Sequence, residues 1–286
     1  MRGAPETMEV LRPRSAPDAV KIFSKNPNAL PFAGGTEFMV TWNLGLMNGR
    51  NVLDLSGVRE WTKIKATPKS VLIGALATHR HIQDHPVTQR EFPLLVQACA
   101  TIGAAQIQNR GTLGGNIANA SPAGDTFPPL LVYEAVVHLI SARGRQTMPI
   151  SEFFTGVKKT KIGRGELIEA IELPFLDKRP QRQVFRKVGT RLAQAISKTM
   201  AAGLLRTGKD GLVEDFRFAF GSMAPTAVRL TEAEALVVGK KLSPAVIEEA
   251  CRLLDRNVSP IDDIRSTREY RLSVSRNILR RFLENS

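Results

Sequence analysis

Cysteine and aromatic residues are scarce in this sequence, and their scarcity excludes several classes of protein. The only cysteines are Cys99 and Cys251, which lie far apart and have no partner at metal-ligand spacing. A disulfide framework, a zinc site and an iron–sulfur cluster held by this chain are therefore not supported, and both thiols are expected to be reduced core residues. Aromatic residues make up 6% of the chain, too few for the series of stacking side chains typical of single-strand nucleic-acid binders.

Long apolar runs are also absent. No window approaches the roughly 20 consecutive apolar residues that a membrane span requires. The amino-terminal segment MRGAPETMEVLRPRSAPDAV has no apolar stretch of signal-peptide length. We therefore expect a cytoplasmic protein without a membrane span.

Acidic residues are too few to balance the basic ones. The 40 lysine and arginine residues outnumber the 27 aspartate and glutamate residues, which gives a formal net charge of +13. Such an excess suits nucleic acid, an acidic membrane, an anionic cofactor or an acidic partner, and charge alone does not choose among them. Because the basic residues are scattered rather than gathered in one run, nucleic acid is an unfavoured partner.

The chain does contain enough apolar material for a full core. Its 286 residues are 43% hydrophobic, which suits a globular protein of two domains. In the first part of the chain the hydrophobic pattern alternates between strands and helices. We expect strands at 8–13, 28–32, 51–55 and 70–75, and helices at 16–26 and from Phe92 onward. The first strand, helix and strand in this order predict a β-α-β unit.

From Pro128 the pattern changes to short strands separated by turns. The segments LLVYEAVVHLIS and ELIEAIELP, with the turn ARGR between them, predict an antiparallel sheet. The polar stretch 175–183 reads as a boundary. After it, a strand at FRKVG, a helix over AQAISKTMAAGLL and a helix-rich tail predict a smaller α+β domain. We therefore expect a first domain at 1–176, with lobes at about 1–55 and 56–176, and a second domain at 180–286.

Two loops carry paired glycines followed by small polar residues. The first lies in FAGGTEF, residues 32–38, and the second in GTLGGNIANASPAGD, residues 111–125. Glycine allows a ligand to approach the main chain, and consecutive N–H groups can form a concave nest for phosphate oxygens. Two such loops predict one dinucleotide, whose pyrophosphate they would hold without a lysine. The side chains expected to add hydrogen bonds are Thr36, Thr112, Asn116 and Ser121, with Glu37 and Asp125 as candidates for sugar hydroxyls.

Each glycine pair could instead make a tight turn, which is the favoured interpretation for one isolated pair. Other phosphate-binding signatures fail. The chain has no G-x-G-x-x-G motif, and its nearest approach to a P-loop, GLLRTGKD, ends in Asp210 where a hydroxyl is needed. The histidines of THRHIQDH are also unconvincing as metal ligands, because they are expected on a short polar helix with only one carboxylate nearby.

The motif QIQNRGTLGGNIANASPAGD, together with AGGTEF, KVGTR and SPIDDIRSTREYR, resembles the FAD-binding medium subunit of molybdenum hydroxylases. That family includes the flavin subunits of xanthine dehydrogenase and carbon monoxide dehydrogenase, and the similarity extends over nearly the whole chain. The resemblance implies an α+β protein with two parts. The first is a two-lobed FAD-binding domain of the vanillyl-alcohol-oxidase (PCMH) type, and the second is an α+β domain of the CO dehydrogenase flavoprotein type.

The resemblance also implies an oxidoreductase subunit of a heterotrimer. A molybdenum-cofactor large subunit would hydroxylate the substrate, and a [2Fe-2S] small subunit would relay electrons. FAD in this chain would then pass the electrons to a final acceptor such as NAD, a quinone or oxygen. The alternative is a non-redox binding module that kept the scaffold and lost FAD. Neither the hydroxylated substrate nor the final acceptor can be named from the sequence.

Because FAD would perform the redox chemistry, no catalytic side chain and no metal ligand is expected. The resemblance places the two pyrophosphate loops at Pro31, Phe32, Ala33, Gly34, Gly35, Thr36, Glu37 and Phe38, and at Thr112, Leu113, Gly114, Gly115 and Asn116. It implies Asp125 as a ligand-binding aspartate and Ile102 and Ile168 as apolar contacts of the flavin. Lys187 would lie near the flavin N1 and C2 carbonyl and favour the anionic reduced form, although a solvated lysine is the plain alternative. A Gly35→Val substitution is expected to abolish flavin retention and leave the fold largely intact.

Overall fold

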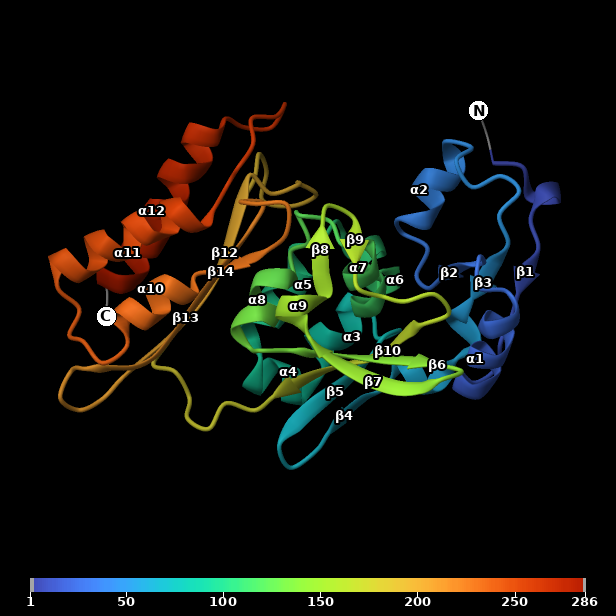
Figure 1. Ribbon diagram of the computed structural model, residues 1–286, viewed down its shortest axis with the longest axis horizontal. Coiled ribbons are helices and arrows are strands. Elements are labelled where there is room, and N and C mark those ends of the chain that lie inside the picture. The colour runs from blue at the N-terminus through green and yellow to red at the C-terminus, as the bar shows by residue number, and fades with distance from the viewer. Residues whose placement is uncertain (1–2, 285–286) are drawn as a thin grey trace.

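The computed structural model describes residues 3–284, which form three sheets with helices and a small hairpin (Figure 1). The amino-terminal lobe is a parallel sheet in the order β1-β3-β2, with bounds β1 Val10–Leu11, β2 Leu30–Phe32 and β3 Val52–Asp54. The helix α1, Ala16–Lys25, joins β1 to β2 and begins where the Ser15 side chain accepts the Asp18 N–H. The predicted β-α-β unit is confirmed, with β3 inserted between its two strands. The lobe also contains α2, Phe38–Asn43, and the 3-10 turns Pro5–Thr7 and Leu55–Gly57.

A second sheet forms the centre of the molecule. It is antiparallel, in the order β4-β5-β10-β6-β7, with bounds β4 Ile64–Ala66, β5 Ser70–Gly74, β6 Val136–Ser141, β7 Gly144–Pro149 and β10 Leu167–Pro174. Its helices and 3-10 turn are Arg59–Thr62, α3 His79–Asp84, α4 Pro86–Glu91, α5 Pro93–Ala100, α6 Ala105–Arg110, α7 Leu113–Asn119, α8 Phe127–Val132 and α9 Ile150–Phe153. A two-stranded hairpin, β8 Phe154–Gly156 and β9 Lys159–Thr160, stands beside α7.

The carboxy-terminal part is an antiparallel sheet covered by three helices on its outer side (Figure 1). Its strands are β11 Arg182–Val188, β12 Thr199–Thr207, β13 Val213–Gly221 and β14 Val228–Arg229, and its helices are α10 Thr231–Val237, α11 Pro244–Asn257 and α12 Arg268–Glu284. One apolar cluster joins this sheet to α10, α11 and α12 through residues such as Phe216, Phe218 and Phe282. Ala202 and Ala219 belong instead to the core of the central sheet, so β12 and β13 contribute to both cores.

Two sequence-based expectations are wrong. Residues 130–132 belong to α8 rather than to a strand, and only 136–141 pair in the sheet. The prolines of α8 lie at its start, where a helix tolerates them, and all six of its residues are buried, so no helical period is visible. The segment 193–205 is not a helix, because residues 199–207 form β12. Seven consecutive buried residues begin this strand, and such a run cannot be told from a buried helix by periodicity.

The amino-terminal lobe packs against one end of the central sheet. Its core contains Phe23 and Leu53, and it also includes Trp61, Ile140 and Leu167 from the central part of the chain. Burial of these side chains fixes the end of β2, where the first glycine loop begins. Within residues 3–284, no helix has the length and apolar character needed to cross a membrane.

Candidate functional site

The two glycine loops, which are far apart in the sequence, touch through their backbones. The first follows β2 and leads into α2, and the second is the start of α7. A Cβ placed on Gly34 would lie 1.8 Å from the carbonyl oxygen of Arg110 and 3.1 Å from the Cα of Gly111. Only glycine permits this approach, so Gly34 is required for contact between the loops. The expectation that both loops belong to one site agrees with this geometry.

The first loop presents a row of free N–H groups. Within the described residues 3–284, the backbone N–H groups of residues 34–37 donate to no protein acceptor. Gly35 has a φ of +78°, and a Cβ there would lie 2.7 Å from the Phe32 ring. A left-handed residue next to residues of other conformation turns successive N–H groups toward one point, as in anion-binding nests. Because Gly35→Val would strain the backbone itself, this substitution does not isolate a ligand contact.

The second loop is built differently. The N–H of Leu113 donates to Ala77 O at 3.0 Å, and that of Gly114 donates to Ala75 O at 3.0 Å. The N–H of Gly115 donates to the hydroxyl of Thr112, which caps α7, at 3.0 Å. These three N–H groups are therefore occupied, and the expectation of a free row in both loops is wrong for the second. Thr112 is the N-cap of α7, because its hydroxyl accepts the Gly115 N–H in the first turn of the helix.

The glycines of the second loop have separate roles. A Cβ on Gly114 would lie 2.6 Å from Ala75 O, so this glycine lets α7 pack against the sheet. Gly115 is exposed, and the one neighbour that a Cβ there would approach is Thr112 Oγ1, at 2.9 Å. Leu113 is fully buried in the central core, so its side chain cannot touch a ligand. Gly115 therefore provides the open surface of this loop.

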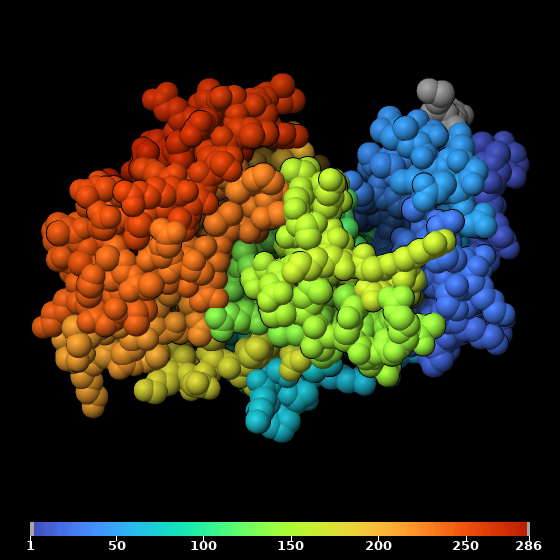
Figure 2. All heavy atoms as spheres, viewed as in Figure 1, coloured from blue at the N-terminus to red at the C-terminus, as the bar shows by residue number. Residues whose placement is uncertain are grey.

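A cavity of about 470 Å³ lies between the amino-terminal lobe and the central sheet. Figure 2 shows the molecule hollowed where the amino-terminal lobe faces the hairpin region around β8 and β9. The cavity is lined by residues of β2 and the first loop, of α7 and of the segment before β10, including Pro31, Ala33, Gly115, Ala118, Ile162 and Ile168. Its size and mostly apolar lining suit one part of a dinucleotide.

Phe32 and Phe38 face away from this cavity. Their rings meet edge to face, with centroids 5.2 Å apart, and both line a separate cavity of about 310 Å³ with Met39 and Trp42. The structure therefore places their backbone, but not their side chains, at the first loop. Thr36 is half-buried within the loop.

A second group of predicted site residues surrounds a buried ion pair. Lys187 Nζ lies 2.6 Å from Asp125 Oδ2 and also donates to Thr101 O at 3.0 Å. Among the described residues, the other oxygen of Asp125, Oδ1, is buried and accepts no hydrogen bond. Burial raises the pKa of Asp125 to about 6, although the charge and hydrogen bond of Lys187 act in the opposite direction. An unpartnered buried acceptor requires a donor, and a bound ligand is one source of it.

The neighbours of this pair complete the group. Ile102 follows Thr101 directly and is half-buried, so it lies close to the Lys187 ammonium. Asn116 Oδ1 accepts a hydrogen bond from the Thr126 hydroxyl at 2.6 Å, and Ser121 Oγ accepts the Ala123 N–H at 3.3 Å. These bonds hold the chain between α7 and Asp125.

One residue near the glycine loops was missed by sequence reasoning. Lys158, in the turn between β8 and β9, donates to Glu37 Oε1 at 2.9 Å and to Asn119 Oδ1 at 2.6 Å. Glu37 therefore forms an ion pair with this lysine in the structure. Lys158 lies more than a hundred positions from Glu37 in the sequence, and no short motif marks it. The clamp without a lysine stays a prediction, and the structure places one lysine, Lys158, against Glu37 and Asn119 beside the loops.

The short helix predicted for the histidines exists as α3, but its first residue, His79, is buried rather than exposed on a polar surface. His79 is 2% exposed, and its Nδ1 lies 3.5 Å from the Cys99 sulfur. Burial lowers the pKa of His79 to about 4 and raises the pKa of the Cys99 thiol, which the charge of Asp125 raises further. Within residues 3–284, no group of three or more His, Cys, Asp or Glu side chains is arranged to hold a metal ion.

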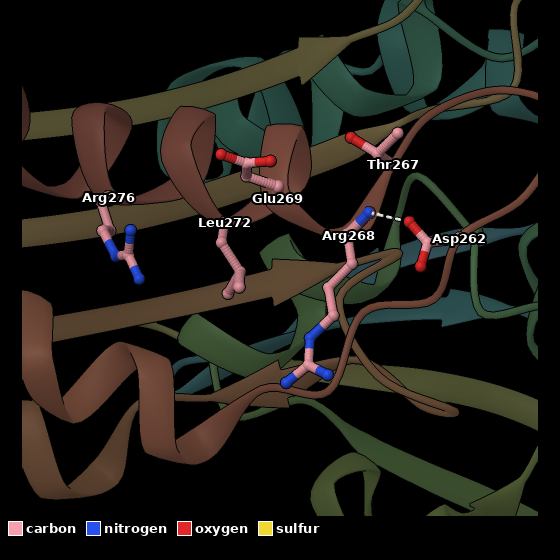
Figure 3. Close-up of a pocket in the computed structure, with 6 residues that line it drawn as sticks. All are labelled: Asp262, Thr267, Arg268, Glu269, Leu272 and Arg276. Carbon is pink, nitrogen blue, oxygen red and sulfur yellow. Dashed lines mark hydrogen bonds between the residues drawn. The ribbon is translucent and has the colours of Figure 1, made fainter.

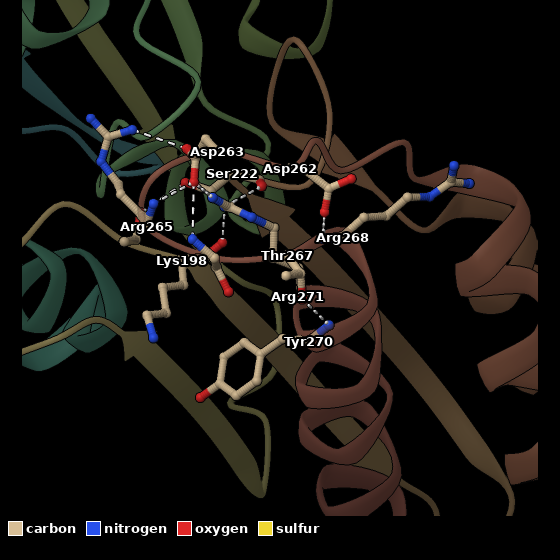
Figure 4. A network of polar contacts seen from close by, with 11 residues as sticks. Lys198, Ser222, Asp262, Asp263, Arg265, Thr267, Arg268, Tyr270 and Arg271 are labelled. Atoms are coloured by element: carbon tan, nitrogen blue, oxygen red, sulfur yellow. Dashed lines mark hydrogen bonds and ion pairs between the residues drawn. The ribbon is translucent and has the colours of Figure 1, made fainter.

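Another cavity, of about 630 Å³, lies elsewhere, at the start of α12 (Figure 3). It contains none of the predicted site residues and is lined by Asp262, Thr267, Arg268, Glu269, Leu272 and Arg276. Beside it, the buried Arg271 donates to Asp263 Oδ1 at 2.8 Å and to the carbonyls of Lys198 and Ser222 (Figure 4). This network joins the start of α12 to the ends of β12 and β13, which is a structural role.

A parallel lobe docked on an antiparallel sheet, with backbone N–H groups at their junction that donate to no described residue, is typical of a dinucleotide-binding protein of mixed α and β structure. Two protein-family matches identify the family within this class. Residues 6–176 match the FAD binding domain in molybdopterin dehydrogenase, and residues 183–286 match the CO dehydrogenase flavoprotein C-terminal domain. The chain therefore belongs to the FAD-binding medium subunits of molybdenum hydroxylases, and the predicted α+β fold and FAD cofactor are confirmed.

Individual relatives resemble this chain over nearly its whole length. The glyceraldehyde dehydrogenase medium chain of Sulfolobus acidocaldarius is 30% identical over 94% of this chain and 95% of its own. A putative xanthine dehydrogenase FAD-binding subunit of Escherichia coli is 29% identical over 94% of this chain and 92% of its own. Among solved structures, carbon monoxide dehydrogenase from Hydrogenophaga pseudoflava has a chain with a TM-score of 0.91 and 26% identity, covering 97% of this chain and 96% of that one.

Proposed function

We propose that this chain transfers electrons from a [2Fe-2S] partner subunit, through FAD, to a final acceptor such as NAD, a quinone or oxygen. A molybdenum-cofactor large subunit would complete the assembly and hold the substrate. The relatives named as medium chains support a multi-subunit enzyme. The observation that carries the proposal is the row of free N–H groups at residues 34–37, which lies against the second glycine loop.

The residues present fit FAD at two separated places. The free N–H groups of the first loop suit the pyrophosphate, and the exposed Gly115 leaves room beside it. At the other place, the unpartnered Oδ1 of Asp125 suits an N–H or O–H donor of the cofactor. Bound FAD supplies the electron-transfer chemistry, and the protein supplies orientation and charge.

Individual contacts follow from this fit. We propose that Ile168 and Ile102 provide apolar contacts with the cofactor, since the first lines the cavity and the second lies beside the ion pair. Lys187 would place its ammonium near the flavin N1 and C2 carbonyl, where a cation favours the anionic reduced form. Asn116 and Ser121 act indirectly, because their hydrogen bonds shape the segment that ends at Asp125.

An absorption spectrum distinguishes this function from a non-redox module that has lost FAD. We expect flavin bands in the purified protein, or their appearance after incubation with FAD and removal of the excess. Protein that shows neither would refute the flavoprotein function.

A substitution at Gly115 tests the location of the site. Gly115→Val adds a side chain at the exposed side of the second loop, and its Cβ would lie 2.9 Å from Thr112 Oγ1. Thermal unfolding without FAD is therefore measured beside the affinity, to separate a weakened cap of α7 from a blocked site. We expect the affinity for FAD, measured by flavin fluorescence, to fall by about a hundredfold or more, the equivalent of about 2.7 kcal/mol. The matched control is Ala66→Val, which adds similar bulk at an exposed position of β4. Equal affinity in both variants would contradict the proposed site.

The electron-transfer role needs a separate measurement. The FAD-loaded chain is mixed with its chemically reduced [2Fe-2S] partner, and bleaching of the flavin band is followed in time. We expect bleaching, followed by recovery when an acceptor is added. A flavin that stays oxidised in the assembled complex would show that electrons do not take this route.

A further inference from the structure

Lys158 joins the two glycine loops across the cleft. Its Nζ donates to Glu37 Oε1 at 2.9 Å in the amino-terminal lobe and to Asn119 Oδ1 at 2.6 Å on α7. The hairpin that carries it faces the amino-terminal lobe across the hollow in Figure 2. One side chain thus links the loop with free N–H groups to the helix that begins at the second loop.

The backbone at Lys158 is held in an uncommon conformation. Lys158 has a φ of +56°, and Ala120, which follows the last residue of α7, has a φ of +46°. The N–H of Lys158 donates to the carbonyl of Ala120 at 3.0 Å, so two left-handed residues meet at one point. A residue with a side chain in this region costs free energy, and such positions gather at ligand clamps and switches. Glycine would relieve the strain, yet the position is occupied by a lysine whose side chain is engaged.

The charge of Lys158 offsets the negative charge of Glu37 beside the first loop. Glu37 is the last residue of the free N–H row, and an unpaired carboxylate there would repel the two negative charges of a pyrophosphate. Pairing with Lys158 neutralises that carboxylate. The nearby Lys161 does not serve the same purpose, since it pairs with Glu152 at 3.5 Å.

We propose that Lys158 is a cofactor-positioning residue, a strap that holds the first loop against α7 and slows the release of FAD. The proposal rests on the proposed FAD site. Loss of the strap frees Glu37 and removes one of the links between the amino-terminal lobe and α7, so the cleft opens more often and FAD leaves faster. The absorption spectrum of bound FAD stays unchanged, because the strap does not reach the Lys187–Asp125 pair, where the flavin ring is proposed to lie.

The test measures the rate of FAD release from the full chain after dilution, by recovery of flavin fluorescence. The Lys158–Glu37 pair is about half exposed, and Lys158→Met is therefore expected to release FAD about fivefold faster than the wild type, the equivalent of about 1 kcal/mol if association is unchanged. The matched control Lys159→Met removes the same charge from the next residue and is expected to change the rate less than about twofold. Lys158→Arg, which keeps the cation, is expected to restore most of the retention. Equal rates in Lys158→Met and Lys159→Met would overturn the strap.

Two further variants separate the strap from a general effect on folding. Lys158→Gly relieves the left-handed strain, so its thermal unfolding without FAD is expected at or above the wild-type temperature, while FAD release is still accelerated. In a Glu37→Gln background, Lys158→Met is expected to have a smaller effect than in the wild type, because the ion pair is already lost and only the bond to Asn119 is left to break. Fully additive effects would overturn the strap. If the wild type binds no FAD at all, the proposed function fails, whereas a wild type that binds FAD and is insensitive to Lys158 refutes only the strap.

Discussion

The ammonium of Lys187 lies 2.6 Å from the carboxylate of Asp125, and the two side chains are only 11% and 8% exposed. Burial raises the pKa of Asp125 to about 6 even with the lysine present. The pair therefore carries a net charge near zero at neutral pH and is sensitive to the loss of either member. A buried charge that loses its partner tends to become neutral, and Asp125, whose pKa is already about 6, does so at neutral pH more readily than a lysine, whose ordinary pKa is about 10.4.

This coupling predicts an asymmetry between two substitutions at the proposed flavin site. In Lys187→Met, the pKa of Asp125 rises further and its carboxyl takes up a proton, so the local net charge changes little. In Asp125→Asn, the Lys187 charge is no longer balanced and favours the anionic reduced flavin. We expect the two-electron midpoint potential of bound FAD at neutral pH to rise by about 30 mV or more in Asp125→Asn, the equivalent of about 1.4 kcal/mol, and to change less in Lys187→Met.

Spectroelectrochemical titration of the FAD-loaded variants measures both potentials. Lys161→Met, which removes an exposed and distant cation, serves as the control for net charge. A larger fall in potential for Lys187→Met than the rise for Asp125→Asn would show that the lysine acts as an isolated charge.

His79 predicts a dependence of stability on pH. Burial lowers its pKa from 6.5 to about 4, so in this interval the unfolded chain binds more protons than the folded one. The stabilisation from keeping His79 neutral is fully present above pH 6.5 and is lost as the pH falls toward 4. The magnitude is on the order of 3 kcal/mol, since one pKa unit corresponds to about 1.4 kcal/mol.

Chemical denaturation of the FAD-free protein at several pH values tests this sign. The difference in unfolding free energy between wild type and His79→Gln should shrink as the pH falls from about 6.5 to about 4. Asp125 provides the opposite case, because its raised pKa means that its contribution is present below pH 3.8 and lost as the pH rises to about 6. The wild-type advantage over Asp125→Asn should therefore fall with rising pH. Equal slopes for the two variants would contradict the assigned pKa shifts.

Local patterns in the sequence were sufficient for much of the fold. Short strands flanked by turn residues, such as β5 and β10, and the capped helix α1 lie where they were predicted. Segments that are buried on all sides were not predictable in this way, because α8 and β12 have no exposed face to give a period. The division of the chain near 176–180 stays a prediction, and residues of β12 and β13 contribute to the central core across it.

The candidate site was predictable where its residues stand in compact motifs. Glycine pairs and the serine–proline–aspartate pattern identified the loops. Which glycine allows a close backbone contact and which one is exposed, however, depends on contacts between distant segments. Gly34 meets Arg110, and Gly114 meets Ala75, which no local pattern shows. Lys158 could not be found for the same reason, because its partners lie on α7 and in the first loop.

The contact of Gly34 with the second loop predicts a large effect from one methyl group. Gly34→Ala would place its Cβ 1.8 Å from Arg110 O, so one of the two backbones must move. We expect a loss of about 2 kcal/mol or more in unfolding free energy, together with weakened FAD binding. Gly156→Ala is the matched control, because its Cβ would meet only the Lys159 side chain at 3.9 Å. Comparable denaturation curves for both variants would show that the loops do not touch.

The buried Arg271 predicts that the carboxy-terminal network supports the FAD site from a distance. Its side chain is 3% exposed and binds Asp263. It also donates to the carbonyl of Ser222, and the N–H of Ser222 in turn donates to the carbonyl of Pro122. Arg271→Met would leave the carbonyls of Lys198 and Ser222 without this donor, whereas Asp263 would keep its bonds from Arg265 and Ser266. We expect a loss of about 2 to 4 kcal/mol in unfolding free energy.

The exposed Arg268 is the control for this prediction, because within residues 3–284 its side chain makes no hydrogen bond or ion pair, and its backbone N–H donates to Asp262 at 2.6 Å. Arg268→Met should change the unfolding free energy by less than about 0.5 kcal/mol. Since Pro122 lies in the segment that leads to Asp125, Arg271→Met should also weaken FAD retention under conditions in which the variant remains folded. Wild-type FAD release from folded Arg271→Met would show that the network stabilises α12 and the ends of β12 and β13 without influencing the cofactor.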